Sequence, residues 1–143
     1  MTIQEQFVNE LTEWVGTPHH SNENKKQIGC DCVGMIVGAL REIGLHDYFS
    51  IDDVILTRTY KAGITSSVVL GFMGRNFDRI APTDAITGDL LILKYSERVQ
   101  HIAVLMKGNT LIHSCDRLKK VVIEKYSKGW RTRTVGVYRL RTN

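Results

Sequence analysis

Apolar residues recur every four positions at the start of the chain, which is the spacing of one buried face of an α-helix. These residues are Ile3, Phe7, Leu11 and Val15. A capping-box pattern, Thr2 with Glu5, precedes the helix interior, and Gly16 follows the last apolar position. Because these residues favour a helix start and a helix stop, the pattern predicts an amphipathic helix over residues 3–15.

A second helix is predicted to begin near Asp31 or Cys32 and to stop at Gly44. Its apolar residues lie nearly all round the helix, as is typical of a central helix; they are Met35, Ile36, Val37, Ala39, Leu40 and Ile43. Gly34 and Gly38 lie one turn apart and would let another backbone approach closely. Residues 17–29, between the two helices, form a polar loop without periodicity.

From residue 89 onward the period changes to short runs rich in β-branched residues, separated by small turns. The predicted strands are Leu90–Lys94, 101–106, Thr110–Cys115, 121–124 and 135–140. Helices followed by such strands predict a single α+β domain over residues 1–143, with its helices packed on an antiparallel sheet of about five strands. Residues 45–87 are less regular, and we expect short helices near residues 50–53 and 66–70 there.

Composition excludes several classes of protein. With 43% hydrophobic residues and two prolines in 143 residues, the chain is not a disordered one. Lysine and arginine exceed the acidic residues by 19 − 15, giving a net charge of +4, but the basic residues of the C-terminal part form no recognisable nucleic-acid module. No apolar run is long enough to span a membrane. We therefore expect neither a nucleic-acid partner nor a membrane partner.

The N-terminal residues and the cysteines indicate where the chain folds. The first residues lack a basic region followed by an apolar core, so no signal peptide is expected. Cys30, Cys32 and Cys115 are an odd number of cysteines, and the first two are too close for an ordinary disulfide bond. A reducing compartment is therefore expected.

The candidate chemistry lies in Cys32, His101 and His113. A thiol at a helix N-terminus can have a lowered pKa and act as a nucleophile. If residues 107–109 form a three-residue hairpin loop, Met106 pairs with Thr110, and the two histidines fall on the same face of the sheet as diagonal neighbours. In this register His101 can take the thiol proton while His113 holds the ring of His101. A slip of one residue would separate them.

Other interpretations of the same residues stay open. Cysteine is also a common small buried residue, and a single histidine in a strand is more often structural than catalytic. Cys30 and Cys32, together with His101, His113 and Cys115, also offer donors for a metal ion, although structural zinc sites prefer wider cysteine spacing. The preferred hypothesis is a metal-free and cofactor-free cysteine hydrolase.

The order of these motifs resembles the NlpC-type family of papain-like cysteine peptidases. The matching motifs are Gly29-Cys30-Asp31-Cys32-Val33-Gly34, Gly88-Asp89-Leu90, His101-Ile102-Ala103-Val104 and Ile112-His113-Ser114. Two further stretches, Trp14-Val15-Gly16-Thr17-Pro18 and Arg41-Glu42, are similar to the short tail-associated members encoded by phages and prophages. The resemblance implies a papain-like fold and hydrolysis of peptidoglycan stem peptides, typically between D-γ-glutamate and the following diamino acid.

The resemblance also implies roles for individual residues. Cys32 is the expected nucleophile, His101 the base and His113 the orienting residue, with the backbone N–H of Cys32 helping to hold the oxyanion. Asp31 matches a family aspartate that can bind the free amine of a stem peptide, and it can equally serve as a helix cap. Where the family has serine after the nucleophile and often tyrosine in the Gly-x-Pro turn, this chain has Val33 and His19. Both departures concern substrate recognition.

The resemblance further implies a setting. We expect synthesis in the bacterial cytoplasm without a signal peptide, delivery in a phage tail or virion, and phage tail proteins as partners. Two alternatives keep part of this interpretation: a non-catalytic tail-assembly or wall-binding component with the same fold, and an amidase or acyltransferase that acts on a substrate outside the cell wall.

Overall fold

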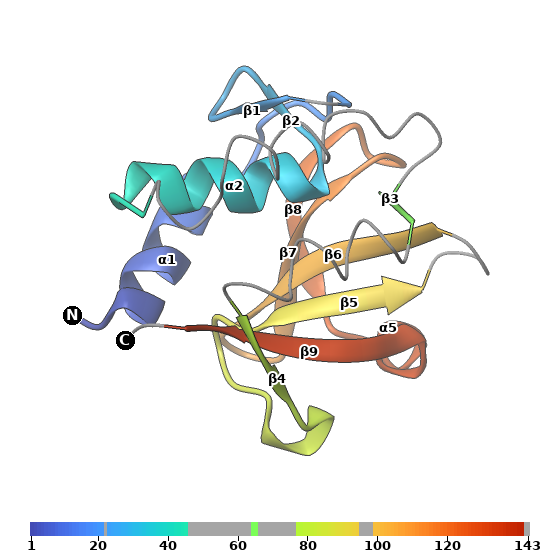
Figure 1. Ribbon diagram of the computed structural model, residues 1–143. Coiled ribbons are helices and arrows are strands. Elements are labelled where there is room, and N and C mark those ends of the chain that lie inside the picture. The colour runs from blue at the N-terminus through green and yellow to red at the C-terminus, as the bar shows by residue number, and fades with distance from the viewer. Residues whose placement is uncertain (22, 46–63, 66–76, 95–98, 142–143) are drawn as a thin grey trace.

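The computed structural model describes residues 1–21, 23–45, 64–65, 77–94 and 99–141, and its helices pack against a curved antiparallel sheet (Figure 1). In chain order the elements are α1 (Ile3–Thr12), β1 (Asn24–Lys25), β2 (Gly29–Cys30), α2 (Cys32–Glu42), β3 (Ile64–Thr65), β4 (Phe77–Ile80), the 3₁₀ turn Pro82–Asp84, β5 (Leu90–Lys94), β6 (Val99–Met106), β7 (Thr110–Cys115), β8 (Lys120–Lys125), α5 (Lys128–Arg133) and β9 (Thr134–Leu140).

The main sheet has the strand order β4-β9-β5-β6-β7-β8, and β3 pairs with β6 outside this order. All of its pairings are antiparallel. The five strands predicted from the sequence are confirmed, and β3 and β4 extend the sheet beyond them. The predicted α+β class is therefore confirmed, with a larger sheet than expected.

Helix α2 lies between α1 and the sheet, as its apolar surface predicts. Every residue from Cys32 to Leu40 is buried, and α2 contacts α1, β6 and β7. The alternating residues Ile102, Val104 and Ile112 belong to the same apolar core as the two helices. The opposite face of the sheet carries a smaller core, to which Ala103 and Leu111 belong.

Two glycines in α2 bring neighbouring chain segments close to the helix, as predicted. A Cβ atom at Gly34 would lie 1.8 Å from the carbonyl oxygen of Glu23, and one at Gly38 would lie 2.2 Å from the ring of Trp14. No side chain fits in either space. The backbone of Glu23, just before β1, and the indole of Trp14 are therefore packed directly against the backbone of α2.

A buried carboxylate ties the start of β5 to β9. Asp89 has no solvent exposure, and its two oxygens accept hydrogen bonds of 2.9 Å from Nε and Nη2 of Arg139. The same carboxylate also accepts from the backbone N–H of Ile86 at 2.9 Å and from the side chain of Gln4 at 3.1 Å. Asp89 therefore joins α1, the turn before β5 and β9.

Some sequence predictions differ from the structure. Helix α1 ends at Thr12 rather than near residue 15, and Val15, predicted on the buried face, is exposed. The polar stretch 17–29 holds β1 and the first residue of β2, which pair as a hairpin, and α5 was not predicted. These are elements of six residues or fewer, too short to show periodicity. The two short helices expected between residues 45 and 87 fall at positions outside the described residues.

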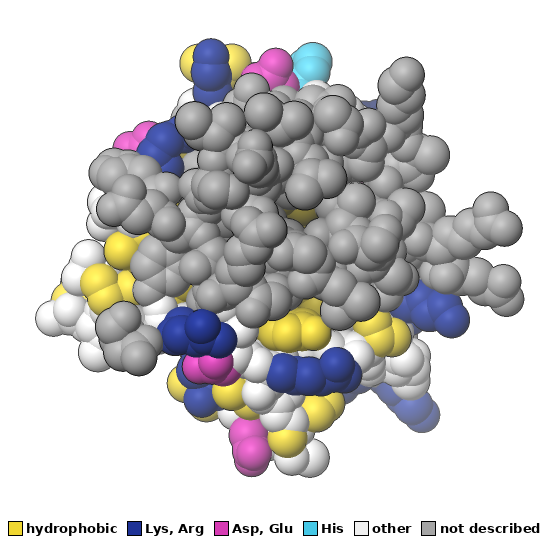
Figure 2. Space-filling model, in the orientation of Figure 1, with side chains coloured by type: hydrophobic (Ala, Val, Ile, Leu, Met, Phe, Trp, Pro, Cys, Tyr) yellow, Lys and Arg dark blue, Asp and Glu magenta, His cyan; other side chains and the backbone are white. Residues whose placement is uncertain are grey.

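The basic side chains are dispersed over the surface rather than gathered in one patch on the face shown in Figure 2. On the face shown in Figure 2, the lysine and arginine side chains of the described residues are interspersed with acidic and apolar ones. Within the described part of the chain, no helix has the length and apolar character needed to cross a membrane.

Candidate active site

The N-terminus of α2 places Cys32 beside the start of β6. The pairing of β6 with β7 covers residues 104–106 and 110–112. Farther along, β7 continues beside β8, and the Ser114 hydroxyl donates a 2.8 Å hydrogen bond to the carbonyl of Cys30. The Cys32 sulfur accepts from the backbone N–H of Ile102 and from that of Val33. The thiol is thus held next to the residue that follows His101.

Burial determines the protonation of this thiol. Cys32 is 6% exposed, and burial raises its pKa, with a further contribution from the neighbouring carboxylate of Asp31. The N–H groups of Ile102 and Val33 oppose this effect but do not outweigh it. The predicted lowering of the pKa is therefore wrong in direction, because desolvation at this helix start is stronger than the favourable backbone dipoles. The resting group is a neutral thiol.

The two histidines meet as the hairpin register predicts. Met106 pairs with Thr110, which confirms the three-residue loop. Nε2 of His101 lies 2.7 Å from Nδ1 of His113. The ring centroids are 4.9 Å apart, and the rings meet edge to face. Burial lowers the pKa of His101 to about 3, with smaller contributions from His113 and His19. Both rings are therefore neutral at physiological pH, since burial also lowers the pKa of His113.

Two residues that were not predicted from the sequence as part of the site extend this arrangement. Nε2 of His113 lies 3.1 Å from Oε2 of Glu124, and the indole N–H of Trp130 donates a 2.8 Å hydrogen bond to Oε1 of the same carboxylate. The Trp130 ring also stacks near His101, with ring centroids 6.5 Å apart. Burial alone would raise the pKa of Glu124, but the hydrogen bonds from Trp130 and His113 lower it. Glu124 is therefore ionised.

These hydrogen bonds fix the positions of the protons. A carboxylate can only accept, so the proton of neutral His113 is on Nε2 and its Nδ1 is an acceptor. Nε2 of His101 must then carry the proton that it donates to His113. The remaining ring nitrogen of His101, Nδ1, is unprotonated and is the atom that can accept a proton. Glu124 thereby selects the tautomer of both histidines. The tautomer of His101 is the one that a general base requires, with Nδ1 unprotonated.

Asp31 has the structural role that the sequence left open. It is the N-cap of α2, and its Oδ1 accepts a 2.7 Å hydrogen bond from the backbone N–H of Gly34. It is 5% exposed. Val33, the departure from the family serine, is buried in the main core. The position after Cys32 therefore contributes to packing in this chain.

His19 lies on the other side of β7. Its Nδ1 is 2.7 Å from the Ser114 hydroxyl, whose own proton goes to the Cys30 carbonyl, so His19 donates to Ser114. Nε2 of His19 lies 3.8 Å from a carboxylate oxygen of Asp116. His19 is therefore joined to β7, the strand that also carries His113.

The metal interpretation based on Cys30 and Cys32 is not supported by the geometry. Among the described residues, the potential metal ligands that come together are His113, Cys115 and Glu124. Cys30 is fully buried and lies beside Ser114, and its pKa is raised to about 12 by burial. It is a core residue.

The comparison with known families decides the affiliation of the chain. The sequence profile described as the NlpC/P60 family matches residues 13–139. The chain belongs to the NlpC/P60 family. Cys32, His101 and His113 all lie within the matched region, as do Glu124 and Trp130. Among curated proteins, none matches the sequence.

Solved structures with the NlpC/P60 name share the fold. NlpC2 from Trichomonas vaginalis has a TM-score of 0.72 at 16% identity, with 98% of this chain and 47% of that chain covered. The NlpC/p60 domain of the peptidoglycan hydrolase SagA gives 0.61 at 17% identity, covering 99% and 100%. The peptidoglycan hydrolase RipB from Mycobacterium tuberculosis gives 0.63 at 16% identity, covering 97% and 65%.

These identities establish the papain-like NlpC/P60 fold and no more. The chain spans about half the length of the Trichomonas protein. The match to the isolated domain of SagA extends over both chains almost completely. The shared unit is thus an NlpC/P60 domain.

Proposed function

We propose that this protein is a cysteine peptidase that hydrolyses an amide bond in peptidoglycan stem peptides. The observation that carries the proposal is the buried Cys32 thiol at the start of α2, next to a His101–His113 pair whose tautomers are set by Glu124. Family membership and the named activity of SagA and RipB support peptidoglycan as the substrate class. The proposed bond is the one between D-γ-glutamate and the diamino acid.

The neutral site favours general-base catalysis. As the Cys32 sulfur attacks the amide carbon, Nδ1 of His101 accepts the thiol proton. The resulting imidazolium keeps its hydrogen bond from Nε2–H to Nδ1 of His113. The backbone N–H of Cys32 is the proposed oxyanion donor. His101 then passes its proton to the leaving nitrogen, the C–N bond breaks, and a thioester remains. Water attacks the thioester, His101 takes up one water proton, and the sulfur regains its proton when the acid product leaves.

Substrate recognition and setting are part of the same proposal. Asp31 and His19 are proposed to bind the stem peptide, although Asp31 also caps α2. A phage or prophage tail is the proposed setting, with tail proteins as partners and delivery in the particle. The motif similarity of residues 14–18 and 41–42 supports it.

Mass spectrometry of digested stem peptides tests this function. Purified peptidoglycan and defined tetrapeptides from several wall types are incubated with the protein, with protein alkylated by iodoacetamide as the control. The proposal predicts new amino termini at the diamino acid and none with alkylated protein. Cleavage at another amide would show that the protein hydrolyses a different bond from the one proposed. Absence of cleavage on every wall type would favour the non-catalytic tail component.

A further inference from the structure

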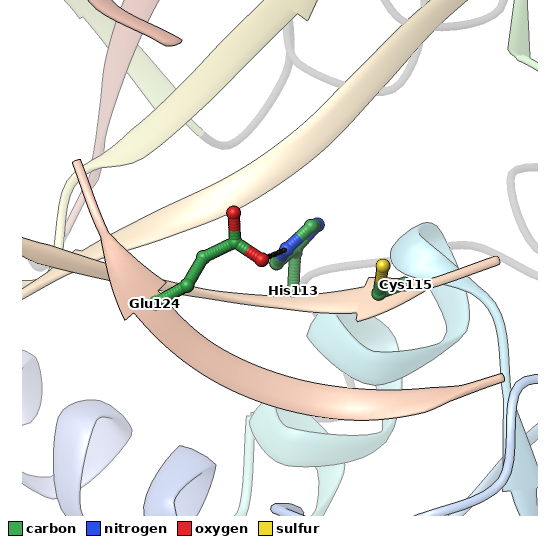
Figure 3. A group of neighbouring side chains, drawn as sticks. All are labelled: His113, Cys115 and Glu124. Atoms are coloured by element: carbon green, nitrogen blue, oxygen red, sulfur yellow. Dashed lines mark hydrogen bonds and ion pairs between the residues drawn. The ribbon is translucent and has the colours of Figure 1, made fainter. Parts of the chain in front are cut away.

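Three potential metal ligands project from the same side of two neighbouring strands (Figure 3). His113 and Cys115 are two residues apart on β7, and Glu124 comes from β8. One donor atom from each lies within 4.8 Å of the others. Cys115 is 2% exposed and His113 has no exposure, whereas the side chain of Glu124 is 26% exposed.

The donor set and its access suit one metal in particular. A nitrogen, a sulfur and a carboxylate oxygen are the ligands that Zn²⁺ prefers, and three protein ligands leave a fourth position for water. Cys115 and Glu124 also line a pocket of about 570 Å³, through which an ion and its water can enter. Ligands of one tetrahedral zinc ion lie roughly 3.3–3.8 Å apart. The three donor atoms lie within 4.8 Å of one another, so closing on the ion requires small rotations of these side chains.

We propose that His113, Cys115 and Glu124 bind a Zn²⁺ ion that switches the hydrolase off. The ion would bind to Nε2 of His113, the nitrogen that in the metal-free protein carries a proton and donates it to Glu124. Nδ1 of His113, the ring nitrogen that zinc would not use, already forms a hydrogen bond with His101. Such a hydrogen bond from the second ring nitrogen orients a metal-bound histidine.

The inhibition follows from the tautomers. When zinc occupies Nε2 of His113, its Nε2 proton leaves to solvent, and the proton shared with His101 moves to Nδ1 of His113. His101 then takes a solvent proton on its own Nδ1 and can no longer accept one from Cys32. Cys115 binds as a thiolate and releases its proton, so one proton is released in total for each ion bound. Inhibition rests on the proposed function, whereas zinc binding does not.

Calorimetry on inactive protein tests the binding. Cys32→Ala removes the reactive thiol as a competing ligand, and the titrant is zinc chloride. We expect about one ion per chain, and at least a roughly tenfold weaker affinity when Cys115→Ser is added. Cys30→Ser in the same background is the matched control and should retain the affinity. No binding, or equal affinity with and without Cys115→Ser, would overturn the site.

Rate measurements test the switch separately. With Cys32 intact, zinc should inhibit cleavage, a chelator should restore it, and Cys115→Ser should raise the half-inhibitory concentration at least roughly tenfold. Each variant is compared with its own zinc-free rate. Binding without inhibition would overturn the switch and leave the site standing. If the zinc-free protein cleaves no stem peptide, the proposed function fails, while the calorimetric result still stands.

Discussion

Replacing Glu124 by glutamine tests the tautomer relay most sharply, because the side chain keeps its shape and loses only its charge. The carboxylate accepts two hydrogen bonds, one from the ring of His113 and one from the indole of Trp130. A glutamine has one oxygen and one NH₂ group to offer to these two donors. The indole N–H of Trp130 can only donate, so the glutamine oxygen should face Trp130. The NH₂ group then faces His113 and favours the opposite tautomer.

The size of the loss can be worked out from these hydrogen bonds. A hydrogen bond to a charged group contributes about 1.5–3 kcal/mol. If that stabilisation is lost in the transition state, the rate falls by roughly 10-fold to 150-fold at 1.36 kcal/mol per factor of ten. Because Glu124 acts through His113 and His101 and is not proposed to touch substrate, we expect the fall in kcat with little change in KM.

A double variant separates the relay from a general structural effect. In Glu124→Gln with Trp130→Phe, the indole N–H is absent, so the glutamine can turn its oxygen to His113. We therefore expect the double variant to be more active than the product of the two single effects. The proton on Nε2 of His113, followed by nitrogen NMR, should be lost in the single glutamine variant and restored in the double one.

Arg117 supplies the control for simple charge loss, because its exposed guanidinium lies 3.9 Å from the carboxylate. Arg117→Ala should change kcat by less than about a factor of two, as exposed pairs contribute little. A Glu124→Gln variant with wild-type kcat, or additive effects in the double variant, would refute the relay. The melting temperature of each variant must stay close to wild type for the comparison to hold.

Three further predictions concern the thiol, a buried ion pair and a close helix contact. Because the pKa of Cys32 is raised by burial, the rate of its alkylation by iodoacetamide should rise about tenfold per pH unit from pH 6 to 9; a plateau below pH 8 would show a lowered pKa. Asp89→Ala should lower the free energy of unfolding in urea by about 3 kcal/mol, whereas Asp78→Ala, at an exposed pair, should cost less than about 1 kcal/mol. Equal losses would contradict this difference in burial. Gly34→Ala should destabilise by more than about 2 kcal/mol because its Cβ meets a backbone carbonyl. Gly129→Ala, whose Cβ would make an ordinary contact of 3.7 Å with Oγ of Ser127, should be tolerated, and similar melting temperatures for both variants would count against the close contact at Gly34.

The pattern of apolar residues predicted the parts of the fold that have strong periodicity. Helix α2 and strands β5 to β9 are long enough for their buried positions to repeat, and the loop at 107–109 fixed the register that brings the histidines together. Short elements such as β1 and α5 have no such signal, since their conformation depends on contacts made elsewhere in the chain.

Glu124 shows why part of the site escaped prediction. Its pairing depends on the register of β7 with β8, in which Val122 lies opposite His113 and Glu124 lies opposite Leu111. The turn at 107–109 was used to predict the register of β6 with β7. The same reasoning applied to the turn at 116–119 would have predicted the register of β7 with β8 and placed Glu124 on the same face as His113. The protonation of Cys32 could not be predicted in the same way, because the degree of burial at the start of α2 is a tertiary property.

The central claim is that Cys32 is the nucleophile of a stem-peptide hydrolase, and the direct test compares two buried cysteines two residues apart. Stem-peptide cleavage is measured for the wild type, Cys32→Ala and Cys30→Ala, with folding checked by circular dichroism. The account predicts cleavage by the wild type and by Cys30→Ala, and none by a folded Cys32→Ala protein. Cleavage by Cys32→Ala at the wild-type rate would contradict it.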